Sequence, residues 1–223
     1  MKREIIITSD GSTTIYLPEW NEQYHSKHGA IQEAYHVFIK AGFEQIKKDK
    51  IDVLEIGFGT GLNCFITILE VQKNNKKVNY VGVEAYPVLQ DEIKKLNYVS
   101  VLKAIQYQPI FDKLHAVSLG EKHKILPNFS LTKEQKLFKE IDAVNQFDLI
   151  YFDAFGARVQ PELWTEDIFK KMFIALKNNG ILVTYTAKGS VRRAMQFVGF
   201  TVERLPGPPG KREMLRAIKF TNS

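Results

Sequence analysis

Three glycines at alternate positions constrain the fold of this chain more than any other feature of its sequence. They lie in the run Glu55-Ile56-Gly57-Phe58-Gly59-Thr60-Gly61-Leu62-Asn63. The apolar run from Ile51 to Ile56 predicts a β-strand before them, and Leu62 to Gln72 predicts a helix after them. Glycines let the backbone turn tightly and approach a ligand, while the helix N-terminus offers unpaired amide donors. The sequence therefore predicts a cofactor-binding loop at the end of a strand.

A carboxylate ends the next predicted strand, Asn79 to Glu84. Glu84 follows the glycines by about 20 residues, where a carboxylate can accept hydrogen bonds from both hydroxyls of a ribose. A surface glutamate is the alternative, and the nearby glycine loop favours the ribose role. Leu62 stands where a dinucleotide fingerprint has its third glycine, which weakens an NAD interpretation. Glu55 either orients the loop or approaches the ammonium group of a cofactor.

Short apolar runs alternate with helix-like segments from residue 51 onward, which is the pattern of parallel strands joined by crossover helices. The predicted fold class is α/β. The other expected elements are strands at Phe147 to Asp153, Gly180 to Tyr185, Phe200 to Leu205 and Met214 to Phe220, a third parallel strand near Lys124 to Phe129, and a helix from Glu166 to Leu176. The prolines and glycines at 206–210 suit only a loop, so the last two strands should form a hairpin.

The residues before the sheet form a separate segment. Ile5 to Thr8 and Thr13 to Leu17 flank Asp10-Gly11, a hairpin turn signal, and Ile31 to Ile46 predicts an amphipathic helix. We therefore expect an N-terminal extension over 1–48, packed on a catalytic domain over 49–223. With 44% hydrophobic and 25% charged residues, a chain of this size suits a globular fold.

Charge and cysteine content exclude several classes of protein. Cys64 is the single cysteine, which excludes an internal disulfide and a cysteine-based zinc site. No apolar run approaches the roughly 20 residues that span a bilayer, and Met1 to Ile7 is too short for a signal-peptide core, so we expect a cytoplasmic protein. From Lys188 to the end, eight basic residues face two acidic ones. This local charge suggests contact with phosphate, and a solvated surface is the alternative.

Motifs spread over nearly the whole chain narrow the interpretation. The glycine loop with Glu84 resembles class I S-adenosylmethionine-dependent methyltransferases. Together with further motifs, it resembles the methyltransferase part of the tRNA wobble-uridine modifying family (MnmC/MnmD). The further motifs are Tyr24-His25-Ser26-Lys27-His28-Gly29 with Glu33, Asp153-Ala154-Phe155 with Pro161-Glu162-Leu163-Trp164, Thr184-Tyr185-Thr186-Ala187-Lys188-Gly189 with Val191-Arg192-Arg193, and Gly210-Lys211-Arg212-Glu213-Met214.

The resemblance implies a Rossmann-like fold and a reaction. The implied sheet is mostly parallel and seven-stranded, with a C-terminal antiparallel hairpin. The implied reaction is N-methylation of 5-aminomethyl-(2-thio)uridine at the wobble position of tRNA, with S-adenosylmethionine as donor and S-adenosylhomocysteine as product. Family members are often fused to a flavin-dependent oxidase. This chain resembles the stand-alone version, so we expect no FAD, no metal, a separate enzyme that supplies the aminomethyl group, and a monomer.

The resemblance and the residues together give a candidate site. The expected cofactor-binding residues are Glu55, Gly57, Phe58, Gly59, Gly61, Leu62, Asn63, Glu84, Ala85 and Asp153. The expected substrate-binding residues are Tyr24, Ser26, His28, Glu33, Phe155, Tyr185, Lys188, Arg192, Arg193, Lys211 and Arg212. The last five should contact phosphates of the anticodon stem-loop without reading its sequence. The aromatic members of the set are expected to stack on the wobble base or to wall the methyl donor.

Asp153 is the expected catalytic residue. Ligands of parallel sheets bind at the carboxyl ends of the strands, and Asp153 ends a central one. Its carboxylate can accept a hydrogen bond from the amine, aim the lone pair and stabilise the positive charge that forms. A carboxylate that only caps the following turn is the alternative. His25 and His28 invite a metal interpretation, which we reject because no cysteine partner exists; either could touch the amine or the cofactor carboxylate.

Two segments depart from the family pattern. Many class I methyltransferases carry an acidic residue after the third strand, near the adenine amino group, whereas the expected position here reads Phe129-Ser130-Leu131. The segment Gly156-Ala157-Arg158 also replaces the usual small residue and proline after Asp-Ala-Phe. Two alternatives to the tRNA methyltransferase stay open: an aminopropyltransferase of the polyamine type, or another small-amine methyltransferase, on the same fold, and an RNA-binding module without catalysis. A requirement for tRNA, and cofactor binding, would separate them.

Overall fold

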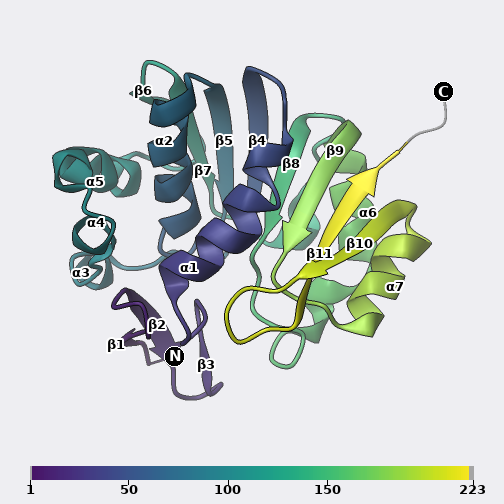
Figure 1. Ribbon diagram of the computed structural model, residues 1–223, viewed down its shortest axis with the longest axis horizontal. Helices are drawn as coiled ribbons and strands as arrows, with labels where there is room; N and C mark the ends of the chain where they lie inside the picture. Colours follow the sequence, from purple (N-terminus) through teal and green to yellow (C-terminus); the bar gives the residue numbers. More distant parts are fainter. Residues whose placement is uncertain (1, 221–223) are drawn as a thin grey trace.

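The computed structural model describes residues 2–220 and places eight strands in one mixed sheet (Figure 1). Their order across the sheet is β10-β11-β9-β8-β4-β5-β7-β6. The strands are β4 (Lys50–Ile56), β5 (Lys77–Val83), β6 (Lys122–Leu126), β7 (Phe129–Glu134), β8 (Phe147–Phe152), β9 (Leu176–Thr184), β10 (Phe200–Pro206) and β11 (Glu213–Lys219). Strands β9, β8, β4, β5 and β7 are parallel, and β11, β10 and β6 run antiparallel to their neighbours.

Helices cover both faces of the sheet, which is why its central strands are apolar on both sides. All six residues of β8 are buried, and successive ones face opposite layers: Tyr151 packs in one core and Phe152 in the other. The first core includes α1 (Ala30–Ala34), α2 (Leu62–Asn74) and α5 (Gln108–Ala116); Figure 1 shows α1 and α2 crossing one face. The second includes α6 (Glu166–Ala175) and α7 (Gly189–Phe197). The α/β prediction is confirmed.

Shorter helical segments fill the connections between these elements. They are α3 (Gln90–Ile93), α4 (Tyr98–Val101), the π-helix η1 (Tyr35–Lys40), and the 3-10 turns η2 (Phe43–Gln45), η3 (Ile105–Tyr107), η4 (Phe138–Glu140) and η5 (Pro161–Trp164). No helix among residues 2–220 is long and apolar enough to cross a membrane.

The N-terminal segment forms its own small sheet at the carboxyl ends of the parallel strands. It contains β1 (Glu4–Ile7), β2 (Thr13–Leu17) and β3 (Glu22–Gln23) in the order β1-β2-β3. The predicted hairpin turn is present, and the Asp10 carboxylate accepts hydrogen bonds from the Ser12 N–H at 3.1 Å and the Gln32 N–H at 3.0 Å. Asp10 therefore joins the hairpin to the start of α1. Met1 and 221–223, the outermost residues of the two predicted domains, lie outside the described residues.

Three predictions about elements need correction. The sheet has eight strands where we expected seven. The third parallel strand is β7, whereas the predicted stretch near Lys124 to Phe129 covers most of β6 and the turn after it. The pattern failed because β6 and β7 form a hairpin in which both arms are short and partly exposed. The predicted helix over Ile31 to Ile46 ends at Lys40, and the chain then turns at Gly42, where it packs so closely on the sheet that a Cβ would lie 2.6 Å from the Phe38 carbonyl oxygen.

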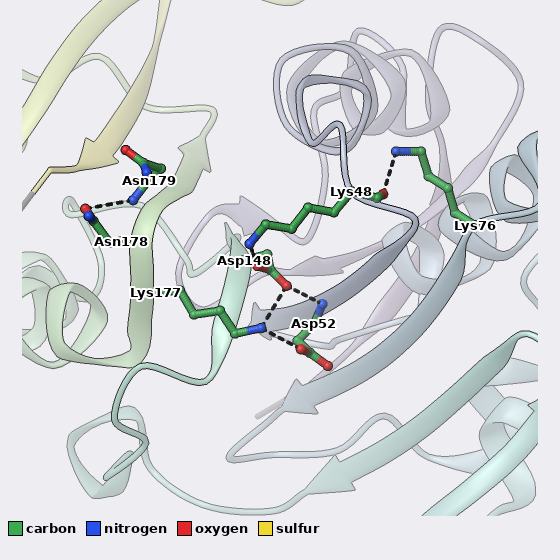
Figure 2. Close-up of polar contacts among 7 residues, drawn as sticks. All are labelled: Lys48, Asp52, Lys76, Asp148, Lys177, Asn178 and Asn179. Atoms are coloured by element: carbon green, nitrogen blue, oxygen red, sulfur yellow. Dashed lines mark hydrogen bonds and ion pairs between the residues drawn. The ribbon is translucent and has the colours of Figure 1, made fainter.

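An ionic cluster closes the amino ends of the parallel strands (Figure 2). The Asp148 carboxylate, 2% exposed, accepts hydrogen bonds from Lys48 Nζ at 2.6 Å, Lys177 Nζ at 3.0 Å and the Asp52 N–H at 2.9 Å. Lys177 Nζ also lies 2.6 Å from Asp52 Oδ2. Burial opposes ionisation of Asp148, but the hydrogen bonds from Lys48, Asp52 and Lys177 outweigh it and lower the pKa of Asp148. This end of the sheet is fixed and charge-compensated.

Candidate active site

The glycine loop turns directly after β4, as the sequence predicts. Gly57, Gly59 and Gly61 all have positive φ, and Gly61 is the N-cap of α2. A Cβ at Gly57 would lie 2.4 Å from the Asp153 carbonyl oxygen, so a side chain there would collide with the segment after β8. The loop and Asp153 are therefore held together through the backbone.

A cavity of about 1370 Å³ opens beside this loop, at the carboxyl ends of β4, β5 and β8. Segments far apart in the sequence line it: the N-terminal sheet, the glycine loop, and the loops after β5, β7, β8 and β9. Of the expected site residues, the cavity is lined by Tyr24, Ser26, His28, Glu33, Gly57, Phe58, Gly59, Leu62, Asn63, Glu84, Ala85, Asp153, Phe155, Tyr185 and Lys211.

Glu84 is fixed by two backbone hydrogen bonds. Its Oε2 accepts from the Gly59 N–H at 3.0 Å, and its Oε1 accepts from the Tyr86 N–H at 2.9 Å. Each carboxylate oxygen has a further lone pair, so the fixed side chain can still accept hydrogen bonds from a ligand in the cavity. The Glu84 carboxylate is therefore held in one orientation at the edge of the cavity.

The Asn63 amide joins two carboxylates at the floor of the cavity. Its Nδ2 donates to Glu55 Oε1 at 2.9 Å and to Asp153 Oδ2 at 2.8 Å, which uses both of its protons. Glu55 is 1% exposed and also accepts a hydrogen bond from the Tyr80 hydroxyl at 2.8 Å. Burial, with the nearby Asp153 and Glu84 charges, raises the pKa of Glu55 well above its ordinary value, against the hydrogen bonds from Asn63 and Tyr80. Glu55 does not line the cavity; it orients Asn63 from below.

Asp153 lies between this floor and the open cavity. Its backbone N–H donates to the Ile56 carbonyl at 2.8 Å, so its position is fixed by β4 as well as by β8. Burial and the Glu33 carboxylate raise the pKa of Asp153 to about 7, while the hydrogen bond from Asn63 and the Lys211 charge lower it. A carboxylate with this pKa can change its protonation state near neutral pH.

Aromatic side chains form one wall of the cavity. Tyr24 and Trp20 meet the Phe155 ring edge to face, with centroids 4.9 and 5.6 Å away. The segment that carries Phe155 is held by the Trp164 Nε1–H, which donates to the Phe155 carbonyl at 2.7 Å, and by the Tyr185 hydroxyl, which donates to the Ala154 carbonyl at 2.8 Å. The wall begins directly beside the glycine loop, because a Cβ at Gly59 would lie 3.1 Å from the Tyr24 ring.

The predicted basic group divides into two sets. Lys211 turns into the cavity, where it pairs with Glu33. Lys188, Arg193 and Arg212 are exposed, and Arg212 lines a second hollow of about 330 Å³ that shares Tyr185 and Lys211 with the main cavity. Arg192 is partly buried on α7. Glu55, Gly61, Lys188, Arg192, Arg193 and Arg212 are the expected site residues that do not line the main cavity.

Several cavity residues were absent from the predicted site. Gln135 follows β7 and lines the cavity; placing the third parallel strand too early concealed both it and Glu134, the acidic residue that ends that strand. Arg158, in the segment that departs from the family pattern, donates to the Trp20 and Asn21 carbonyls at 2.9 and 3.0 Å. It clasps the N-terminal sheet to the loop after β8, a contact that no local pattern indicates.

His25 also belongs to the cavity wall. Its Nδ1 lies 3.0 Å from Thr14 Oγ1, and burial lowers its pKa to about 4, against the Glu33 and Asp10 charges, so it is neutral at pH 7. Within residues 2–220, no three His, Cys, Asp or Glu side chains are arranged to hold a metal ion.

Comparison with known proteins matches this architecture to named families. The sequence model of an S-adenosyl-L-methionine-dependent methyltransferase family matches residues 106–220. The chain is 28% identical over 223 residues to the tRNA 5-methylaminomethyl-2-thiouridine biosynthesis bifunctional protein MnmC of Leptospira borgpetersenii, covering 91% of this chain and 33% of the relative. The corresponding protein of a Marinomonas species is also 28% identical, over 88% of this chain and 31% of the relative. The chain thus spans about a third of these relatives.

Two solved structures share the fold. MnmC2 from Aquifex aeolicus superposes with a TM-score of 0.76 at 25% identity, covering 97% of this chain and 69% of that one. Spermidine synthase from Thermotoga maritima superposes with a TM-score of 0.57 at 16% identity, covering 97% and 68%. The second likeness concerns the fold alone.

Proposed function

The chain belongs to an S-adenosyl-L-methionine-dependent methyltransferase family, and from this premise we propose that it methylates the primary amine of 5-aminomethyl-(2-thio)uridine at the wobble position of tRNA, giving 5-methylaminomethyl-(2-thio)uridine. One observation carries the proposal: the Asp153 carboxylate, held by Asn63, faces a cavity built jointly by a glycine loop and an aromatic wall. The names of the relatives and of the Aquifex structure support the tRNA substrate.

The residues around the glycine loop fit the methyl donor. We assign the ribose hydroxyls to Glu84, the adenine end to the segment of Ala85 and Gln135, and the methionine end to the loop backbone above Asn63. Gly57, Phe58, Gly59, Gly61 and Leu62 shape this half of the site, and Glu55 acts through Asn63. When bound, S-adenosyl-L-methionine supplies the methyl group as a sulfonium carbon and leaves as S-adenosyl-L-homocysteine.

Asp153 prepares the substrate amine for attack. An alkylamine is mostly protonated at neutral pH, and an ammonium nitrogen has no lone pair with which to attack carbon. The Asp153 carboxylate accepts a proton from the ammonium form of the substrate and releases it to the solvent of the cavity. The ionised carboxylate then accepts a hydrogen bond from the neutral amine, which aims the lone pair. As the N–C bond forms, the same carboxylate stabilises the positive charge on nitrogen. Asn63 keeps Oδ2 of Asp153 in place during these steps.

The aromatic wall and the exposed cations are assigned to the RNA. Phe155, Tyr24 and Tyr185 provide planar surfaces for an unstacked wobble base. Arg212 lines the second hollow, and Lys188 follows another of its lining residues, Ala187. We assign these two cations and the exposed Arg193 to phosphates of the anticodon stem-loop, with Arg192 supporting them from α7. Ser26, His28 and Glu33 complete the substrate side.

The proposal extends to the context of the reaction. We propose that residues 1–48 act as an extension that walls the active site of a catalytic domain over 49–223, and that the protein works in the cytoplasm as a monomer. Methyl transfer involves no oxidation or reduction, so we assign no FAD to this step. A separate catalytic activity supplies the aminomethyl group.

Transfer of labelled methyl groups tests the proposal directly. The substrate is tRNA from cells blocked after aminomethyl-uridine formation, and the products are digested to nucleosides for mass analysis. A labelled 5-methylaminomethyl nucleoside is expected. Matched reactions contain tRNA that lacks the aminomethyl group, or a small diamine with decarboxylated S-adenosylmethionine. Product with the diamine and none with tRNA would contradict the proposal in favour of aminopropyl transfer.

A further inference from the structure

The Lys211 ammonium group is held inside the cavity. Lys211 lies in the loop between β10 and β11, forms an ion pair with Glu33 Oε1, and places Nζ 3.9 Å from the centre of the Tyr185 ring. Glu33 is 7% exposed, and its Oε2 accepts a hydrogen bond from the Ser26 N–H at 2.8 Å. In this structure the ammonium group of Lys211 therefore contacts a carboxylate and an aromatic ring inside the cavity, whereas we expected it to contact phosphate.

The loop that carries Lys211 is anchored on both sides. Before it, the His36 Nε2–H donates to the Pro206 carbonyl oxygen at 2.8 Å. Next to it, a Cβ at Gly210 would lie 2.2 Å from the His28 ring, so the loop backbone packs directly on that side chain. Lys211 is therefore placed in the cavity by the packing of its loop as well as by its own ion pair.

The Asp153 carboxylate faces groups from five elements. Asn63 on α2 donates a hydrogen bond to it, and Glu55 on β4 lies below it. Glu33 on α1, Tyr185 after β9 and Lys211 from the β10–β11 loop complete its surroundings. Of these five groups, Lys211 alone carries a positive charge.

We propose that Lys211 is a positioning residue: by pairing with Glu33 inside the cavity, it offsets negative charge beside Asp153 and so favours the unprotonated carboxylate that the substrate amine requires. The catalytic role of Lys211 rests on the proposed function. Its effect on the charge of Asp153 does not, because that effect is present in the protein without substrate. Glu33 alone would place a second negative charge beside Asp153, and Lys211 alone would place an uncompensated positive one. As a pair, the Lys211 charge offsets part of the Glu33 charge at the Asp153 carboxylate.

Removing either charge of the Lys211–Glu33 pair should therefore shift the midpoint of the Asp153 titration, and the two shifts should have opposite signs. In Lys211→Met, Glu33 remains without its counter-ion, so the Asp153 midpoint should rise by about half a unit to one unit. In Glu33→Gln, the ammonium group remains, so the midpoint should fall by a similar amount. The double variant should lie between the two single variants, and Lys211→Arg should stay near the parent protein because the charge is kept.

The titration is measured in the free protein by NMR of carboxylate carbons after 13C-aspartate labelling, with Asp153→Asn used to assign the Asp153 resonance. Thermal unfolding checks that each variant is folded, and Lys211→Arg and Glu33→Gln provide charge-retaining and isosteric changes if Lys211→Met unfolds. Opposite shifts in the single variants, with an intermediate midpoint in the double variant, support the inference. Midpoints that do not move, or that move in the same direction, overturn it.

The pH dependence of methyl transfer separates this inference from the proposed function. The acidic midpoint of the rate profile should shift with the NMR midpoint in each variant. If the NMR midpoints shift as expected while aminomethyl-uridine tRNA accepts no methyl group, the proposed substrate is wrong and the charge balance stands. If methyl transfer occurs and the midpoints stay fixed, the substrate stands and the role of Lys211 is wrong.

Discussion

The same two strands carry a pair of acidic residues at each end, and the two pairs have opposite surroundings. At the amino ends, Asp52 and Asp148 lie among lysine ammonium groups and a backbone N–H, and the pKa of Asp148 is lowered. At the carboxyl ends, Glu55 and Asp153 share one neutral amide, and the pKa of each is raised. Compensated charge fixes one end of the sheet, whereas the other end retains groups that can exchange protons with a ligand.

The comparison teaches that buried carboxylates of similar sequence context can serve different purposes. Asp52 and Glu55 both lie on β4 and Asp148 lies on β8, so strand position alone does not distinguish them. The partners do: Lys48 and Lys177 reach Asp148 at distances of 2.6 and 3.0 Å, while Asn63 reaches Asp153. Four measurements test whether the two ends of these strands differ in this way.

Asp153→Asn should have the largest effect. Methyl transfer to tRNA should fall by roughly 10²–10⁴-fold, because the side chain can no longer accept a proton from the amine. The melting temperature should stay the same or rise, since a poorly compensated buried charge is removed. Activity is measured with labelled S-adenosylmethionine and folding by thermal unfolding. Normal turnover in a folded variant would remove Asp153 from the mechanism.

Asp148→Ala is the matched change at the other end. It should lower the free energy of unfolding by about 2–4 kcal/mol, because the Asp52 N–H loses its acceptor, Lys48 loses its counter-ion, and Lys177 keeps only Asp52. At a temperature where the variant is folded, its turnover should match the parent protein. Denaturant titration gives the stability. A large loss of turnover without loss of stability would mean that the two ends are functionally coupled.

The two ends should respond to pH in opposite senses. The folded-state pKa of Asp153, about 7, exceeds its ordinary value of 3.8, so its contribution to stability declines as pH rises from about 4 to 7. The pKa of Asp148 is lowered below 3.8, so its contribution is lost as pH falls below that value. Unfolding at a series of pH values checks this: Asp153→Asn should remove the decline on the neutral side, and Asp148→Ala the decline on the acidic side. Unchanged profiles in both variants would contradict the assignment.

Glu55→Gln should have the smallest effect. Because burial raises the pKa of Glu55 and favours its neutral form, an amide of the same shape preserves the acceptor for Asn63 and a partner for the Tyr80 hydroxyl. We expect a change below about 1 kcal/mol in stability and little change in turnover. Glu55→Ala is the contrasting control, since it leaves both partners unpaired. A collapse of activity in Glu55→Gln would show that Glu55 acts as a charge.

Local signals in the sequence predicted the fold and the centre of the site well. The strand, glycine loop and helix around Gly57 depend on neighbours in sequence, and so does the position of Asp153 at the end of β8. The β6–β7 hairpin was placed wrongly because both of its arms are short and half-polar, which left no clear period to follow. That error alone concealed Gln135 from the predicted site.

Contacts between distant segments could not be predicted. Lys211 and Arg212 are adjacent in sequence and chemically alike, yet one turns into the cavity and the other is exposed. Only the packing of the β10–β11 loop on His28 and His36 decides between them. The clasp from Arg158 to the N-terminal sheet has the same origin, since it depends on tertiary placement and on no local pattern.

The hydrogen bond from Arg158 to Trp20 and the ion pair of Lys211 with Glu33 also determine the order in which parts of the site form during synthesis. Arg158 meets Trp20 across 138 positions, and Lys211 meets Glu33 across 178. Contacts of such long range close late, because the chain between them must first be made and ordered. The N-terminal segment therefore emerges from the ribosome early, but its contacts with Arg158 and Lys211 form only after those residues have been synthesised. A nascent chain holds the glycine loop long before it holds a pocket that could receive a nucleotide.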